Sequence, residues 1–425
     1  MKKRQDLSNF KTVFSGAIGN VLEWYDFAVY GYFAKILAPT FFPSDDKLVS
    51  LISVFGVFAA GFLMRPVGAV LFGHIGDKKG RKQALMLSVL LMAITTTCLG
   101  FLPTYATAGI LAPVLLTLFR LLQGISIGGE LTTSISFIVE IAPENKRGFY
   151  GSWTLFSASL GILLGSAVGA LTDSFLTSEQ LAKWGWRIPF YVGFLVGSYG
   201  LYIRRGLKEP EVFHKLKETG DVVKFPLSYS FRHYTREIIL VAGSLWIFST
   251  GFYLAFVYLP TYLSTETHTV LSVALDINTM SMLILLPLIV FMACLSDRFG
   301  RKPVMMAGTA GFVLLSYPLF KGLSVESQWV IFFVQVIFAI FQSTLEGAVP
   351  AFLVETFPTK VRVSAISFSY NIALGIFGGT TPLVATYLIK VTNNIYSPAL
   401  YLVFCAGVSL ICLFFLKETY KKKLE

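Results

Sequence analysis

Six ionisable residues lie inside long apolar stretches of the sequence, where charged side chains are rare. A charged side chain at the centre of a membrane helix costs about 2.5–3.5 kcal/mol on insertion scales, so such residues usually bind ions, protons or substrates. The structural alternative is an ion pair that joins two helices. The six residues are Glu23, Asp26, Arg65, Arg120, Glu130 and Glu346.

Their spacing places several of these residues on shared helix faces. Side chains three or four positions apart lie on the same side of a helix, so Glu23 and Asp26 share one face. On another predicted helix, Arg120, Gln123 and Glu130 follow a single stripe. Each helix therefore presents a polar face, and two such faces could meet around a proton or a charged solute.

Two charged loop motifs occur twice in the sequence, in the same order. The segment GHIGDKKGRK at 73–82 is echoed by ACLSDRFGRK at 293–302, a displacement of 220 positions. The spacing E-x-x-P-x-x-x-R occurs at 140–147 and again at 355–362, a displacement of 215 positions. Two motifs that recur at nearly the same displacement indicate an internal repeat.

The repeat predicts two related six-helix halves, residues 1–205 and 236–425, joined by a basic linker at 206–235. Charge networks of this kind can hold a protein in a closed conformation and break as it opens. We therefore expect the charged members of both motifs to form a cytoplasmic gate. They are Asp77, Arg81, Glu140, Arg147, Asp297, Arg301, Glu355 and Arg362.

The composition excludes a water-soluble protein. Hydrophobic residues make up 55% of the 425 positions and charged residues only 14%, whereas soluble domains contain about 25% charged residues. Twelve apolar runs approach the roughly 20 residues that span a bilayer as a helix, and they are too long and uniform for barrel strands. We therefore predict an all-α polytopic membrane protein with twelve transmembrane helices. The runs are roughly 12–37, 48–73, 83–102, 108–140, 149–172, 187–205, 236–262, 277–296, 303–322, 328–354, 363–390 and 397–416.

Lysine and arginine indicate the orientation in the membrane. With the N-terminus placed in the cytoplasm, 27 of these 35 residues lie on the cytoplasmic side, six on the opposite side and two inside helices. Cytoplasmic loops are enriched in both residues, so we expect both termini in the cytoplasm and a multi-pass plasma membrane protein, in the inner membrane of a bacterium. The net charge of +11 comes from these short clusters and does not indicate a nucleic-acid partner.

No motif points to an enzyme, a metal site or a bound cofactor. The four cysteines lie in apolar runs and have no metal-ligand spacing. The sequence also shows no nucleophile–base pair and no phosphate-binding glycine loop. We expect a monomer whose partners are a small-molecule substrate and the lipid bilayer.

The segment at 73–82 resembles the signature G-x-x-x-D-x-x-G-R-K of the major facilitator superfamily. Within it, the chain resembles the metabolite–proton symporter family, which includes proline/betaine and α-ketoglutarate permeases. This resemblance is carried by GNVLEWYDFAVYGYFA at 19–34, FRLLQGISIGGE at 119–130 and WGWRIPF at 184–190. It implies the major facilitator fold and import of a small metabolite together with protons.

The resemblance also implies roles for the buried charges. In proton-coupled sugar transporters of the superfamily, an aspartate of the first helix pairs with an arginine of the fourth. Asp26 and Arg120 match those positions, so they are expected to couple proton binding to transport, with the proton as coupling ion. Glu23, one turn from Asp26, is an alternative proton site.

The buried charges indicate the kind of substrate. Arg65 and Arg120 can accept a carboxylate, and Tyr30 could hold an ammonium group by cation–π contact. Four buried acids against two buried bases favour a zwitterion such as proline or betaine over a dicarboxylate. The residues expected to bind it are Arg65, Glu130, Gln123, Tyr30 and Glu346.

Two other functions remain open at this point. A passive facilitator would share the fold, although it has no need of titratable groups inside the membrane. A non-transporting membrane sensor could also be built on a transporter fold. Uptake measurements with amino acids, betaines and organic acids would separate these functions.

Overall fold

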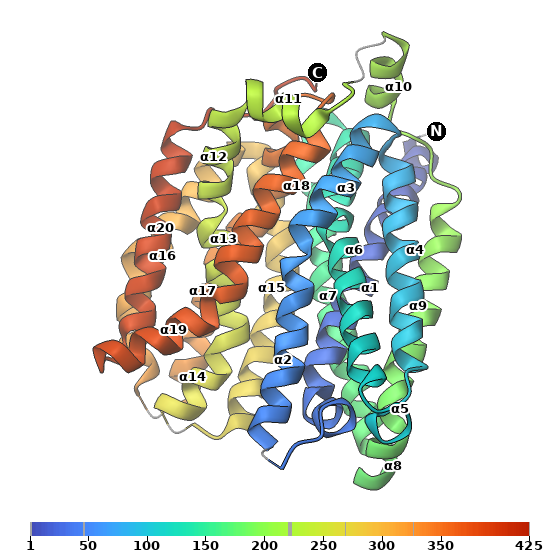
Figure 1. The fold of residues 1–425 in the computed structure, drawn as a ribbon. Coiled ribbons are helices and arrows are strands. Elements are labelled where there is room, and N and C mark those ends of the chain that lie inside the picture. Colours follow the sequence, from blue (N-terminus) through green and yellow to red (C-terminus); the bar gives the residue numbers. More distant parts are fainter. Residues whose placement is uncertain (1, 46, 220–222, 268, 326, 425) are drawn as a thin grey trace. The chain divides into compact units, whose positions relative to one another are not determined.

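A computed structural model describes residues 2–424 of the protein, apart from 46, 220–222, 268 and 326. The described residues form helices joined by short loops, and none of them lies in a β-strand (Figure 1). Ten helical segments are long and apolar enough to cross a membrane, and they coincide with ten of the twelve predicted runs. The expected all-α polytopic architecture is therefore confirmed.

The other two predicted runs correspond to α1 (Lys2–Phe41) and α9 (Ile188–Arg204). At 17 residues, α9 extends about 26 Å, slightly less than the roughly 30 Å of a bilayer core. Helix α1 has 40 residues, more than a span needs, and it carries Glu23 and Asp26 in its middle. The two helices pack against each other and against α4.

Contacts divide the chain into two compact units, which we describe separately. The first comprises residues 1–138 and 157–227, and the second comprises 139–156 and 228–425. Segment 139–156, which joins two helices of the first half of the sequence, thus packs with the second unit. The boundaries at 205 and 235 and the orientation of the termini stay predictions.

The first unit combines an apolar core with buried polar side chains from several of its helices. Aromatic side chains of α1 and α9 form much of its apolar core, among them Tyr25, Phe41 and Phe190. Besides α1 and α9, its helices are α2 (Lys47–Leu63), α3 (Arg65–Lys78), α4 (Arg81–Gly100), α5 (Tyr105–Ala108), most of α6 (Leu111–Ile141), most of α7 (Arg147–Phe175), α8 (Ser178–Lys183) and α10 (Glu211–Glu218).

A close helix contact positions Arg65 in this unit. The chain leaves α2 at Met64 and starts α3 with Arg65 and Pro66, and proline is well tolerated in a first helical turn because its missing N–H has no partner there. Helix α6 then approaches so closely at Gly128 that a Cβ there would overlap the carbonyl oxygen of Arg65. Glycine at this position therefore allows the start of α3 to pack directly against α6.

The second unit contains two membrane segments that are each interrupted by a π-helical turn. Extra residues in a helix release backbone carbonyls and often mark functional positions. The interruptions are η3 (Tyr253–Tyr258), between α13 (Trp246–Phe252) and α14 (Leu259–Glu266), and η4 (Ala373–Gly378), between α18 (Arg362–Ile372) and α19 (Gly379–Thr392). The other helices are α11 (Pro226–His233), α12 (Thr235–Ser244), α15 (Leu271–Phe299), α16 (Arg301–Leu323), α17 (Gln328–Thr356) and α20 (Ser397–Phe415).

Polar side chains satisfy the carbonyls that these turns release. Gln335 of α17 donates a hydrogen bond to the carbonyl of Ala255 at 3.0 Å, and Asn278 of α15 donates to that of Phe256 at 3.1 Å. Ser249 donates to the carbonyl of Ala373 at 3.0 Å. Without such partners, exposed backbone groups inside a membrane protein would cost several kcal/mol each.

Candidate functional site

A buried ion pair joins α1 and α6 in the first unit. Nη1 of Arg120 lies 2.6 Å from Oδ2 of Asp26, and both side chains are almost fully buried. Oδ1 of Asp26 accepts hydrogen bonds from Thr96 and Gln123, each at 3.0 Å. Both carboxylate oxygens of Asp26 therefore have partners from other helices.

Aromatic rings surround the cation of this pair. The guanidinium carbon of Arg120 lies 4.0 Å from the ring centre of Tyr30, 5.8 Å from that of Phe27 and 5.6 Å from that of Phe58. Cation–π contacts within about 6 Å are attractive, and more so away from water. The ring of Tyr30, expected to face a substrate ammonium group, contacts Arg120 in this structure.

A second buried ion pair lies further along α6. Oε1 of Glu130 accepts a hydrogen bond from Nη2 of Arg204 at 2.5 Å, and Oε2 accepts one from Ser88. Arg204 also donates to the carbonyl oxygens of Ser15, Gly16 and Leu85. The pair therefore connects α1, α4, α6 and α9, an arrangement suited to holding helices together rather than to binding a solute.

Glu23 differs from the other acids of this unit's interior. Its side chain is 2% exposed, and neither carboxylate oxygen has a hydrogen-bond partner among the described residues. The charged groups that act on it electrostatically are Arg65, Glu130 and Arg204. A buried acid without hydrogen bonds is costly when ionised, so this position requires an explanation beyond packing.

In the second unit, the buried acid Glu346 projects from α17. Its side chain is 4% exposed, and Oε1 accepts a hydrogen bond from Nε2 of Gln342 at 3.1 Å. Gln342 also donates to the carbonyl of Phe248 at 3.0 Å. No basic side chain of the described chain pairs with Glu346, so this acid could pair with the cationic group of a bound solute.

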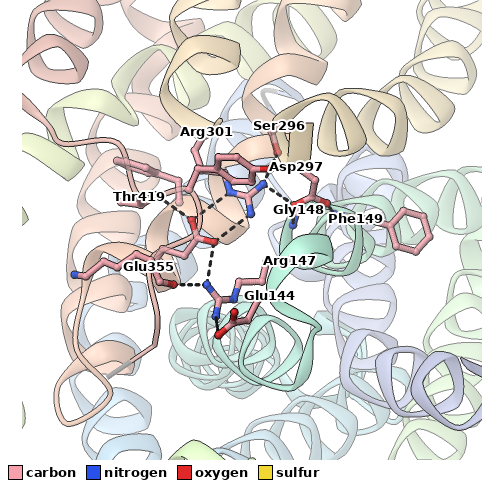
Figure 2. Close-up of polar contacts among 12 residues, drawn as sticks. Glu144, Arg147, Gly148, Phe149, Ser296, Asp297, Arg301, Glu355 and Thr419 are labelled. Atoms are coloured by element: carbon pink, nitrogen blue, oxygen red, sulfur yellow. Dashed lines mark hydrogen bonds and ion pairs between the residues drawn. The ribbon is translucent and has the colours of Figure 1, made fainter. Parts of the chain in front are cut away.

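The loop motifs of the second unit form a dense charge cluster (Figure 2). Arg301 makes two hydrogen bonds to the carboxylate of Glu355, at 3.1 and 3.2 Å, and an ion pair with Asp297 at 2.7 Å. Asp297 also accepts the backbone N–H groups of Gly148 and Phe149, both at 2.8 Å. These N–H groups belong to the first turn of α7, where a negative charge is favourable.

The two copies of E-x-x-P-x-x-x-R exchange partners. Arg362 of the second copy binds Glu140 of the first at 2.6 Å, and Arg147 of the first copy lies 3.5 Å from Glu355 of the second. All four side chains are buried. Segment 139–156 is thus fastened to the second unit by both ends of its own motif.

In the first unit, the loop motif at 73–82 forms a charge cluster with fewer members. Asp77 and Arg81 make an ion pair at 3.4 Å, and both are fully buried. Arg81 also donates to the carbonyl of Gly76 at 2.7 Å and stacks over Phe213 of α10 at 4.9 Å. Seven of the eight charged residues predicted as gate members are therefore buried, and Asp297 is partly buried, with 9% of its side chain exposed.

Sequence reasoning missed two glutamates that repeat in the same way. Glu209 accepts the backbone N–H groups of Arg81 and Lys82, at 2.5 and 3.1 Å, and so caps α4. Glu418 accepts those of Arg301 and Lys302, at 3.1 and 3.0 Å, and caps α16. The signal was present in the sequence, because L-K-E occurs at 207–209 and again at 416–418.

Two family descriptions match the chain. The family "Sugar (and other) transporter" matches residues 12–211, and the family "Major Facilitator Superfamily" matches residues 241–425. Together they cover most of both predicted halves.

Curated relatives extend over nearly the whole chain. A protein of Dickeya dadantii described as a glycine betaine/proline/ectoine/pipecolic acid transporter is 36% identical, over 98% of this chain and 84% of its own length. The proline/betaine transporters of Salmonella typhimurium and Escherichia coli K12 are 35% and 34% identical, each over 98% of this chain and 85% of their own.

Solved structures share the fold at low sequence identity. The proton:xylose symporter XylE, bound to 6-bromo-6-deoxy-D-glucose, matches with a TM-score of 0.81 at 18% identity, covering 98% of this chain and 97% of its own. The Escherichia coli fucose:proton symporter FucP matches with a TM-score of 0.67 at 17% identity, covering 94% and 98%. The protein is therefore a multi-pass membrane transporter rather than an enzyme, and the chain belongs to the major facilitator superfamily.

Proposed function

We propose that this protein imports a small, carboxylate-bearing solute together with protons by alternating access, as a monomer in the bacterial inner membrane. The observation that carries the proposal is the Asp26–Arg120 ion pair, which is buried where only a functional or structural role can offset its cost. The names of the curated relatives support transport of a zwitterion such as proline or betaine.

The pair supplies a simple coupling mechanism. While Asp26 is ionised, it holds Arg120 at 2.6 Å. When a proton neutralises Asp26, the attraction to Arg120 is lost, and Arg120 becomes available to a substrate carboxylate. One charge that crosses 100 mV supplies about 2.3 kcal/mol, enough to accumulate a neutral zwitterion roughly 50-fold.

The substrate's two charges call for two kinds of group. In the first unit, Arg65 and Arg120 are candidates for a substrate carboxylate, and Gln123 contacts Arg120. In the second unit, Glu346 is a candidate for a substrate ammonium group. Glu346 suits that role because Gln342 is its one described hydrogen-bond partner. Glu130 and Tyr30 stay candidates, although in this structure they contact Arg204 and Arg120.

The loop network is proposed to act as the cytoplasmic gate. The partner exchange between Glu140, Arg147, Glu355 and Arg362 supports this role, because both copies of the motif are needed to complete it. Asp77 with Arg81, and Asp297 with Arg301, extend the same chemistry. Breaking these pairs would release segment 139–156.

Purified protein in liposomes that contain a pH indicator would test the proposal. Adding proline or betaine outside should acidify the interior, and a membrane potential that is negative inside should drive labelled solute above its external concentration. Uptake that only equilibrates the solute would favour a passive facilitator. No uptake of any amino acid, betaine or organic acid would favour a sensor.

A further inference from the structure

The three acids inside the first unit differ in how their negative charge is compensated. Asp26 has Arg120, Gln123 and Thr96 as partners. The carboxylate of Glu130 binds Arg204 and Ser88. Glu23, one helical turn from Asp26 on α1, has no hydrogen-bond partner among the described residues, although it is equally buried.

The groups around Glu23 do not replace a direct partner. Those that act on it electrostatically are Arg65 of α3, Glu130 of α6 and Arg204 of α9. The guanidinium nitrogens of Arg204 already donate to three carbonyl oxygens and to Glu130. Glu130 is itself an acid and opposes a second negative charge. An ionised carboxylate in a dry interior needs hydrogen bonds or a paired cation, so this arrangement favours the neutral acid at Glu23.

A structural role does not account for a carboxyl group at this position. Glutamine or an apolar residue would fill the same volume, and neither would carry an ionisable group into the interior. The acid at position 23 makes no described hydrogen bond that would hold two helices together. What a carboxyl group offers in this setting, and an amide does not, is a proton that can leave.

We propose that Glu23 holds the coupling proton in the conformation described here and passes it to Asp26. This inference rests on the proposed function of proton-coupled transport. The two residues are three positions apart and share a face of α1. Glu23 is therefore the proton reservoir, and Asp26 with Arg120 is the switch that the proton operates.

The transfer balances without a further reactant. The O–H bond of the Glu23 carboxylic acid breaks, and an O–H bond forms on the Asp26 carboxylate. Glu23 becomes the anion, with Arg65 as a nearby cation, while Arg120 loses the anion that it had held at 2.6 Å. The total charge of the interior stays constant, so the step needs no ion from outside until the proton is released.

Infrared spectroscopy of the purified protein can detect the reservoir directly. The carbonyl stretch of a protonated carboxylic acid is distinct from that of a carboxylate. At neutral pH the wild type should show this band, Glu23→Gln should lose intensity from it, and Asp26→Asn should keep it. Glu179→Gln is a matched control, because Glu179 is exposed and pairs with Lys183 on the surface.

Transport measurements on the same proteins test the transfer. At 100 mV the wild type should accumulate a neutral zwitterion about 50-fold for one proton, whereas Glu23→Gln should reach a ratio of about 1. It should still exchange internal for external solute. Glu23→Asp, which keeps a carboxyl group, should restore part of the accumulation.

Several other results would each contradict the inference. Uphill accumulation by Glu23→Gln, or a band that this substitution leaves unchanged, would overturn the inference. Loss of exchange in both Glu23→Gln and Glu23→Asp would assign Glu23 a structural role and overturn it as well. A wild type with no protonated-acid band overturns it without any variant. A wild type that moves solute but no protons would instead refute the proposed coupling, and the inference with it.

Discussion

Arg362 and Glu140 are separated by 222 positions in the chain, and Nη1 of the arginine donates to Oε1 of the glutamate at 2.6 Å. Both side chains are buried, and each belongs to a different copy of the same motif. The reverse pair, Arg147 with Glu355, is longer at 3.5 Å. In that pair the glutamate is shared, because Arg301 also holds it. The repeat in the sequence therefore appears in space as two crossed ion pairs of unequal strength.

The shorter pair should dominate the stability of this region. Removing one member of a buried ion pair typically costs about 3–5 kcal/mol, because the other charge is left uncompensated. Glu140→Gln and Arg362→Gln should each lower the free energy of unfolding, and the double variant should lose less than the sum. A double-mutant cycle, measured by chemical unfolding in detergent, should give an interaction free energy between the two side chains of about 0.5–3 kcal/mol. Additive effects would mean that the pair contributes nothing specific.

Asp77→Asn should reduce transport much more than it reduces folding. Asparagine keeps the shape but removes the charge that faces Arg81 at 3.4 Å, and a charge network that no longer closes correctly should slow the transport cycle. We expect initial uptake to fall by about tenfold or more, which corresponds to roughly 1.4 kcal/mol in the barrier, with unchanged expression. Glu179→Gln is the control for an equivalent loss of charge at the surface. Normal uptake by Asp77→Asn would remove Asp77 from the gate.

The long apolar runs and the charges inside them sufficed to predict the all-α membrane fold and the buried positions of these charges. Glu23, Asp26, Arg65, Arg120, Glu130 and Glu346 are all at most 4% exposed. The pairing of Asp26 with Arg120 was expected from the family resemblance, and the structure brings the two together.

The ion-pair partner of a buried charge was harder to predict than its buried position. Arg204 lies near the end of the predicted run 187–205, and only the packing of four helices makes it the partner of Glu130. Spacing along one helix is visible in the sequence, whereas a contact over 74 positions depends on tertiary packing. The two π-helical turns were missed for the same reason, because their released carbonyls are satisfied by side chains of other helices, α13, α15 and α17.

Glu418 and Glu209 should each stabilise the protein by capping a helix. Each accepts two backbone N–H groups at the start of a helix that follows a glycine with positive φ, Gly300 at 104° and Gly80 at 117°. Loss of a helix N-cap costs about 0.5–2 kcal/mol. Glu418→Ala and Glu209→Ala should therefore lower the midpoint of thermal unfolding in detergent, whereas Glu179→Ala should change it little. An unchanged midpoint in both variants would show that these caps are not stabilising.

Glu346→Gln should weaken the binding of zwitterions. The substitution removes a buried carboxylate whose described hydrogen-bond partner is Gln342, and with it the attraction for a substrate ammonium group. We expect the KM for proline or betaine to rise by about tenfold, equivalent to 1.4 kcal/mol, with less change in the maximal rate. Competition assays would show the effect as a weaker displacement of labelled solute. If a dicarboxylate is taken up saturably and zwitterions do not compete, the assignment of Glu346 and the preferred substrate are both wrong.

Asp26→Asn should separate exchange from accumulation. Asparagine retains an oxygen that can accept from Thr96 and Gln123, as Oδ1 of Asp26 does at 3.0 Å. It has no negative charge for Arg120, so it resembles the permanently protonated state of the switch. The variant should exchange internal for external solute, because both solute-bound conformations remain accessible. It should lose proton-driven accumulation, because position 26 can no longer bind and release a proton.

Counterflow and uphill uptake in the same liposomes measure the two activities side by side. Uphill accumulation by Asp26→Asn at a normal proton-motive force would exclude Asp26 as the coupling switch, and loss of counterflow would show that its charge is required for the conformational change itself.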